Sequence, residues 1–268
     1  MKRRSVKLFL YLGLLAAYGL SSATHAGNLV QNGDFSNNQF GGLSHELASG
    51  NWNTSPTPLV GSGVTGWTNT TNNALNFWFN TTNPTSVGAI SQYSEIQLLP
   101  PSYNNTNLPD TVTGFLALDG DPNYHGAITQ SIGNSTTGFL TVGQQYEVDF
   151  YWAATQLTNR TGNTWERLDV QLGNSAVQSV SYGSASDLKL PTHGFTGWTY
   201  ESMIFTATRA TETLSFLSQG GPGNAPPINL LADVSMHAVP EPSSLALSAL
   251  GIVGLFVVRA RRPAKLNA

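Results

Sequence analysis

The chain has 268 residues, of which 10% are charged and 10% aromatic, and it contains no cysteine. This composition is too apolar and too aromatic for a disordered chain, and its many Gly and Asn residues disfavour a helical one. The absence of cysteine excludes disulfides, thiolate metal sites and cysteine nucleophiles. Residues 27–238 hold four basic and fourteen acidic residues, so their charge of −10 argues against nucleic acid as a partner.

The first 26 residues are typical of a secretory signal peptide. MKRRSVK is a basic n-region, LFLYLGLLAAYGL is an apolar h-region, and Thr24 and Ala26 are small residues at the −3 and −1 positions of a cleavage site. We therefore expect the Sec machinery and signal peptidase as partners. An uncleaved anchor is the alternative, although the apolar run is short for a membrane-spanning helix.

Residues 28–238 contain short β-type runs separated by turn-rich stretches, with no helical period of comparable length. Strands are expected at LNFWF, FLALDG, AITQSI, YEVDFYW, RLDVQL, TYESMIF, TLSFLS and INLLADVSM. Alternation turns one side of each run inward, as with Val148 and Phe150 in YEVDFYW. In the last run it places on one side Ile228, Leu230, Ala232, Val234 and Met236. The pattern predicts an all-β fold, an antiparallel jelly-roll β-sandwich, with long polar insertions at residues 37–63 and 80–110.

The segments NLVQNGDFS (28–36) and PPINLLADVSM (226–236) bracket this region and resemble those of galactose-binding-like jelly rolls, particularly exported choice-of-anchor domains and carbohydrate-binding modules. The resemblance implies a structural Ca²⁺ where the first and last strands meet, with Asp34 and Asp233 as oxygen ligands. The alternative is that Asp34 caps a turn and Asp233 is a solvated strand residue. Ser36 departs from the family, which usually has Glu there. The stretch DGDPN (119–123) is open to the same two interpretations, calcium ligands or a plain turn.

Sugar binding is expected of the stretch YWAATQLTNRTGNTWERL (151–168), because it combines aromatic rings with planar polar groups. The candidate ligand-binding residues are Gln156, Asn159, Arg160 and Trp165. The alternative is that Trp165 covers the end of a sheet.

No catalytic residue is assigned. The histidines are scattered, and the sequence contains neither HExxH nor Gly-x-Ser-x-Gly. Spacing pairs no two carboxylates across a cleft, as a glycosidase needs. We therefore expect a protein that is not an enzyme.

The C-terminal stretch has three parts in order. Pro240, Glu241 and Pro242 form a stiff extended tripeptide. The uncharged run at residues 245–258, with the two preceding serines, would reach ~24 Å as a helix, slightly short of a bilayer core. The cations Arg259, Arg261 and Arg262 follow, and the positive-inside rule places them in the cytoplasm.

This arrangement resembles the PEP-CTERM sorting signal of Gram-negative bacteria, in which an exosortase recognises the Pro-Glu-Pro and removes the tail. Together with the segments above, the resemblance gives a predicted organisation of a signal peptide at 1–26, a β-sandwich ectodomain at 27–238, a sorting signal with a transmembrane helix at 239–262 and a cytoplasmic tail at 263–268. An ordinary permanent anchor is the alternative. Either way, the ectodomain is expected in the periplasm and then at the cell surface or outside the cell.

The sequence thus predicts an exported, non-enzymatic protein of the cell surface or extracellular matrix that binds exopolysaccharide. Two alternatives stay open: a structural or adhesive surface protein without a small ligand, and a polysaccharide hydrolase.

Overall fold

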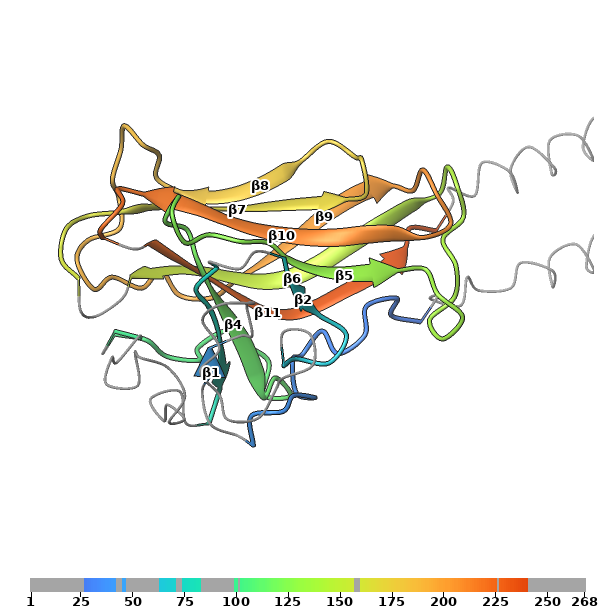
Figure 1. Ribbon diagram of the computed structural model, residues 1–268, viewed down its shortest axis with the longest axis horizontal. Coiled ribbons are helices and arrows are strands. Elements are labelled where there is room, and N and C mark those ends of the chain that lie inside the picture. Colours follow the sequence, from blue (N-terminus) through green and yellow to red (C-terminus); the bar gives the residue numbers. More distant parts are fainter. Residues whose placement is uncertain are drawn as a thin grey trace, which may run out of the picture. The chain divides into compact units, whose positions relative to one another are not determined.

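The computed structural model describes residues 27–41, 45–46, 63–70, 74–82, 99–100, 102–156, 160–225 and 227–240. The described part contains eleven strands and no helix, and residues Ala26–Ala238 form one compact unit (Figure 1). The strands are β1 (His45–Glu46), β2 (Thr68–Asn69), β3 (Asn76–Asn80), β4 (Gly114–Asp119), β5 (Ile128–Ile132), β6 (Gln145–Gln156), β7 (Trp165–Leu172), β8 (Gln178–Tyr182), β9 (Thr199–Thr206), β10 (Glu212–Gly221) and β11 (Pro227–Ala238).

The strands form two antiparallel sheets that pack face to face. The first has six strands in the order β1-β3-β4-β11-β6-β9, and the second has five in the order β2-β5-β10-β7-β8. The predicted all-β antiparallel sandwich is therefore confirmed. The expected signal helix and transmembrane helix lie outside the described residues. Among the described residues, no helix has the length and hydropathy needed to cross a membrane.

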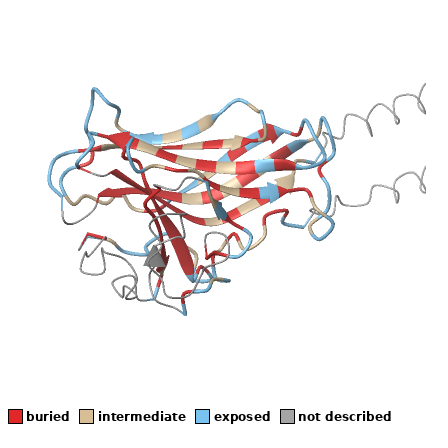
Figure 2. Ribbon diagram, viewed as in Figure 1, coloured by how far each residue is buried: buried red, intermediate tan, exposed pale blue. Residues whose placement is uncertain are grey.

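The inner core lies between the sheets and follows the predicted alternation. Val148 and Phe150 in β6 and Leu168 in β7 point inward, and all three are fully buried. Phe150 meets Phe216 of β10 edge to face, with ring centroids 5.4 Å apart. Figure 2 shows buried and less buried residues alternating along β7 and β10, as expected for strands with one face in a core.

The alternation predicted for β11 is wrong beyond its middle. Leu230 and Ala232 pack on the outer face of the six-stranded sheet, whereas Val234 and Met236 belong to the inner core. The cause is a β-bulge: the pairing of β11 with β6 shifts between Ala232 and Ser235, and Asp233 between them has φ of 50°. An extra residue in one strand moves every later side chain to the other face.

A second core covers the outer face of β3, β4 and β11. Leu108 and Val112, from the segment that precedes β4, are buried there. Tyr103 stacks on Phe115 of β4 with ring centroids 5.4 Å apart, and it also contacts Phe195. Part of the expected polar insertion at 80–110 thus supplies a packed cover, which explains why every residue of β4 is buried.

The loops divide between the two ends of the sandwich because successive strands from β4 onward run in opposite directions (Figure 1). One end carries the connections β4–β5, β6–β7, β8–β9 and β10–β11. The other end carries β5–β6, β7–β8 and β9–β10, together with the end of β11. We call this second end the tail end, because the chain leaves β11 there.

Candidate functional site

The outer face of β6 and β9 carries a group of aromatic and acidic side chains, which we call the tyrosine–carboxylate face. It comprises Glu147, Asp149, Tyr151, Tyr200 and Ser202. The antiparallel register places Tyr151 opposite Tyr200 and Asp149 opposite Ser202. Residues paired in this way lie close enough for their side chains to interact.

Two hydrogen bonds fix the tyrosine–carboxylate face. The hydroxyl of Tyr200 donates to Asp149 Oδ1 at 2.7 Å, and the hydroxyl of Ser202 donates to Glu147 Oε1 at 2.6 Å. The rings of Tyr151 and Tyr200 meet edge to face, with centroids 5.6 Å apart. Tyr200 is nevertheless 55% exposed, so much of its ring is open to a ligand.

The carboxylates also set the protonation of Tyr200. Its hydrogen bond to Asp149, with burial and the negative charges of Asp149 and Glu147, raises the pKa of Tyr200 to about 12. The phenol therefore stays neutral at physiological pH and keeps its proton as a donor. An apolar ring face beside carboxylate acceptors is the combination that recognises a sugar, whose C–H face stacks on the ring while its hydroxyls donate.

Of the predicted sugar-binding residues, Gln156 has a structural role. Its side chain is buried, its amide Nε2 donates to the carbonyl of Gly162 at 2.9 Å, and its Oε1 accepts from the backbone N–H of His193 at 2.9 Å. Both ends of the amide therefore join two loops at the end of the sandwich opposite the tail end.

The other three predicted sugar-binding residues do not form a site with Gln156 in the described structure. Asn159 is outside the described residues, and Arg160 is exposed. Trp165 is half-buried at the start of β7, and its indole packs against Gly221, where a β-carbon would come within 3.0 Å of Nε1. This supports the alternative in which Trp165 covers a sheet end. Ligand binding by Asn159 and Arg160 stays a prediction.

The predicted calcium ligands Asp34 and Asp233 lie near each other. Burial raises the pKa of Asp233, and the negative charge of Asp34 raises it further. The turn of Asp34 packs on the β11 bulge, because Val234 N–H donates to the carbonyl of Gly33 at 2.9 Å. Asp34 Oδ1 accepts weakly from the N–H of Ser36 at 3.3 Å, as in the turn-capping alternative.

Two neighbouring carboxylates with backbone carbonyls are suitable oxygen donors for Ca²⁺. Within the described part of the chain, however, no three His, Asp or Glu side chains are grouped to hold a metal ion. A calcium ion here would need backbone carbonyls or water for most of its ligands.

The DGDPN stretch behaves as a turn. Asp119 Oδ1 accepts from the N–H of Asp121 at 2.7 Å, and Asp121 Oδ1 accepts from the N–H of Asn123 at 2.9 Å. Asp121 Oδ2 accepts from the N–H of Asn224 at 3.1 Å, which ties this turn to the β10–β11 loop. These bonds support the turn interpretation.

Two buried acids have raised pKa values, which favour their uncharged form. Burial raises the pKa of Asp119 to about 7 and the pKa of Glu166 to about 8. The hydroxyl of Thr164 donates to Glu166 Oε1, while Oε2 is buried without a hydrogen-bond partner. Protonation near neutral pH relieves the penalty of burying these charges.

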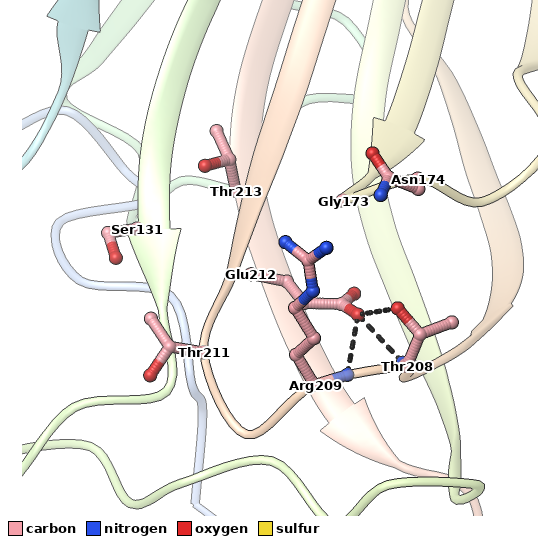
Figure 3. A pocket seen from close by; sticks show the side chains of 8 residues that line it. All are labelled: Ser131, Gly173, Asn174, Thr208, Arg209, Thr211, Glu212 and Thr213. Atoms are coloured by element: carbon pink, nitrogen blue, oxygen red, sulfur yellow. Dashed lines mark hydrogen bonds between the residues drawn. The ribbon is translucent and has the colours of Figure 1, made fainter.

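A polar cavity of about 230 Å³ lies at the tail end (Figure 3). Its lining residues are Ser131, Gly173, Asn174, Thr208, Arg209, Thr211, Glu212 and Thr213. The Glu212 carboxylate holds the β9–β10 turn: Oε1 accepts from the N–H and the hydroxyl of Thr208, both at 2.7 Å, and from the N–H of Arg209 at 2.9 Å. These bonds make Glu212 a turn-stabilising group.

The sequence contained part of the signal for the tyrosine–carboxylate face. Alternation in YEVDFYW already places Glu147, Asp149 and Tyr151 on the side away from the inner core. It does not reveal that Tyr200 and Ser202 pair with them, because the register between β6 and β9 joins residues about fifty positions apart.

The fold belongs to the class of two-sheet antiparallel β-sandwiches, and comparison with known proteins adds the export signal. Residues 238–262 match the PEP-CTERM protein-sorting motif, so the predicted resemblance is confirmed. This motif is the substrate signal for exosortase processing and marks the chain as an exported protein. Of the predicted sorting residues, Pro240 is exposed, and Glu241, Pro242, Arg259, Arg261 and Arg262 lie outside the described residues.

Several solved structures are similar in fold. TmCBM61, solved in complex with β-1,4-galactotriose, is 10% identical, with a TM-score of 0.37 over 79% of this chain and 99% of that one. A CBM4 structure is 15% identical, with a TM-score of 0.33 over 78% of this chain and 99% of that one. The enzymatically active domain of tailspike protein 4 from bacteriophage CBA120 is 11% identical, with a TM-score of 0.36 over 79% of this chain and only 21% of that one.

These similarities concern the fold alone. No curated protein sequence is significantly similar to this chain.

Proposed function

We propose that this is an exported, non-enzymatic protein of the cell surface or extracellular matrix that binds exopolysaccharide through the tyrosine–carboxylate face. In this proposal the signal peptide at 1–26 is removed, the transmembrane helix within the sorting signal at 239–262 holds the protein briefly in the inner membrane, and an exosortase then releases the sandwich. The short segment 263–268 stays on the cytoplasmic side until that cut.

The observation that carries glycan binding is the geometry of Tyr200. Its ring is exposed, yet it is held by the edge of Tyr151 and by the bond from its hydroxyl to Asp149. A ring that is already fixed loses little rotational freedom on binding, so stacking against a sugar is favoured. Glu147 and Asp149 offer acceptors for sugar hydroxyls beside it.

Affinity gel electrophoresis in host exopolysaccharide tests this proposal. We expect the sandwich of residues 27–238 to be retarded and Tyr200→Ala to be retarded clearly less, since this variant removes the apolar ring on which a sugar would stack. Tyr182→Ala is the matched control, because Tyr182 is also exposed but lies on β8 of the other sheet. Arg160→Ala tests the loop that the sequence favoured.

The outcomes separate the alternatives. Loss of retardation with Arg160→Ala and not with Tyr200→Ala would move the site to the β6–β7 loop. No retardation at all, with self-association or adhesion intact, would support a structural or adhesive protein. Release of reducing ends from the polysaccharide would support a hydrolase and contradict the non-enzymatic proposal.

A further inference from the structure

The tail end of the sandwich carries a group of exposed apolar side chains. Phe139 and Val142, in the β5–β6 loop, are 64% and 63% exposed, and Val177, in the β7–β8 loop, is 52% exposed. Single exposed apolar residues are normal on a protein surface. These three, however, share one end of the sandwich, and the loops at residues 133–144, 173–177 and 207–211 contain no acidic residue.

Arg209 is the one charged residue in those three loops, and it is exposed. It lies at the rim of the cavity shown in Figure 3, on the β9–β10 turn. A cation among exposed apolar side chains is the combination found on protein surfaces that lie against lipid headgroups.

The loops are held firmly enough to keep these side chains outward. Leu140 is buried, and its N–H donates to the carbonyl of Ala210 at 2.9 Å. Gly143 N–H donates to the carbonyl of Ala207 at 2.8 Å, so the β5–β6 and β9–β10 loops are joined at two points. Phe139 and Val142 lie between these two points of attachment or next to them in the sequence, and both side chains stay exposed.

The chain leaves the sandwich beside these loops. Ala238, the last residue of β11, pairs with Tyr146, whose hydroxyl accepts from the N–H of Thr141 in the β5–β6 loop. From Ala238 to Leu245, where the apolar run begins, are seven residue steps, which span at most about 25 Å when fully extended. While this run is in a bilayer, this length limits how far the membrane surface can be from the end of β11.

We propose that the tail end contacts the lipid surface for as long as the C-terminal run is embedded. Phe139, Val142 and Val177 enter the interfacial region, and the Arg209 guanidinium lies at the level of the lipid phosphates. This contact orients the sandwich with its opposite end away from the membrane. The inference goes beyond the proposed function and holds whether or not the tyrosine–carboxylate face binds glycan.

Single-cysteine labelling tests the contact, because the native chain has no cysteine. The full chain is reconstituted in vesicles of phosphatidylethanolamine and phosphatidylglycerol with an environment-sensitive fluorophore at one position. The variants are Phe139→Cys and Val142→Cys at the tail end, and Leu188→Cys in the β8–β9 loop at the opposite end as the matched control. Ile252→Cys reports on the apolar run itself. Thermal unfolding checks that each labelled protein is folded.

We expect the labels at 139 and 142 to shift to the blue and to be quenched by a quencher carried on the lipid. The label at 188 is expected to stay accessible to a water-soluble quencher, and the label at 252 to be quenched from the lipid. Labels at 139 and 142 that behave like the one at 188 would overturn the proposal. Water exposure at 252 would overturn it too, since the run would then not be in the bilayer.

Discussion

At the scale of single residues, the buried acids show how local environment decides charge. The pKa of Asp233 is raised by its partial burial and, in addition, by the nearby negative charge of Asp34. An acid whose pKa is raised in the folded state stabilises the fold when it is protonated. That stability is fully present below the pKa of the unfolded chain and is lost as the pH rises through the folded pKa.

We predict that Ca²⁺ reverses this effect and that Asp233→Asn removes the response. The free protein should be more stable as Asp233→Asn than as wild type at neutral pH, because the repulsion from Asp34 is gone. Asn also tolerates the φ of 50° at this position. Added Ca²⁺ should raise the melting temperature of the wild type alone, measured with and without EDTA.

A wild-type melting temperature that does not change with Ca²⁺ would leave Asp34 as a turn cap and Asp233 as a bulge residue, without a metal. A response to Ca²⁺ that persists in Asp233→Asn would place the ion elsewhere.

At the scale of elements, the β11 bulge depends on the close approach of the turn that contains Gly33, near the start of the sandwich. A β-carbon on Gly33 would lie 1.8 Å from the carbonyl oxygen of Val234, far inside any possible contact. The neighbour is backbone, so it cannot move aside without breaking the bond from Val234 N–H to Gly33. Gly33 is therefore needed for its lack of a side chain.

We predict that Gly33→Ala lowers the free energy of unfolding by about 3 kcal/mol or more, as expected for strong overpacking that also breaks a buried hydrogen bond. Gly27→Ala is the control, because a β-carbon there meets nothing within 4 Å and should change stability by less than ~0.5 kcal/mol. Urea unfolding measures both. Equal stability of the two variants would contradict this account of the bulge.

The elements also show what sequence alone can establish. Alternation found eight of the eleven described strands and correctly turned Val148 and Phe150 inward, because a period of two is a local property. It failed after Ala232, because a bulge depends on the turn at Gly33, about two hundred residues earlier. Likewise, the hydrogen bond from Tyr200 to Asp149 depends on the register between two distant strands, which no local pattern encodes.

At the scale of the whole molecule, the last described strand and the sorting motif adjoin in the sequence. The sorting motif begins at residue 238, which is also the last residue of β11. The last described strand therefore ends where the sorting motif starts, and a cut near Pro-Glu-Pro leaves all eleven described strands in place. The sandwich should keep its stability after release.

We predict that Glu241→Gln blocks release, because it removes the only charge between the two prolines that the exosortase is proposed to recognise. Intact mass of the protein from a host with an exosortase should show a chain cut near Pro-Glu-Pro in the wild type, and the full C-terminus in the variant. Asp110→Asn, which removes an exposed charge from the sandwich, is the control and should be processed normally. A wild-type protein that keeps residues 239–268 would show a permanent anchor. In that case the apolar tail end would contact lipid throughout the life of the protein, because nothing would ever separate it from the bilayer.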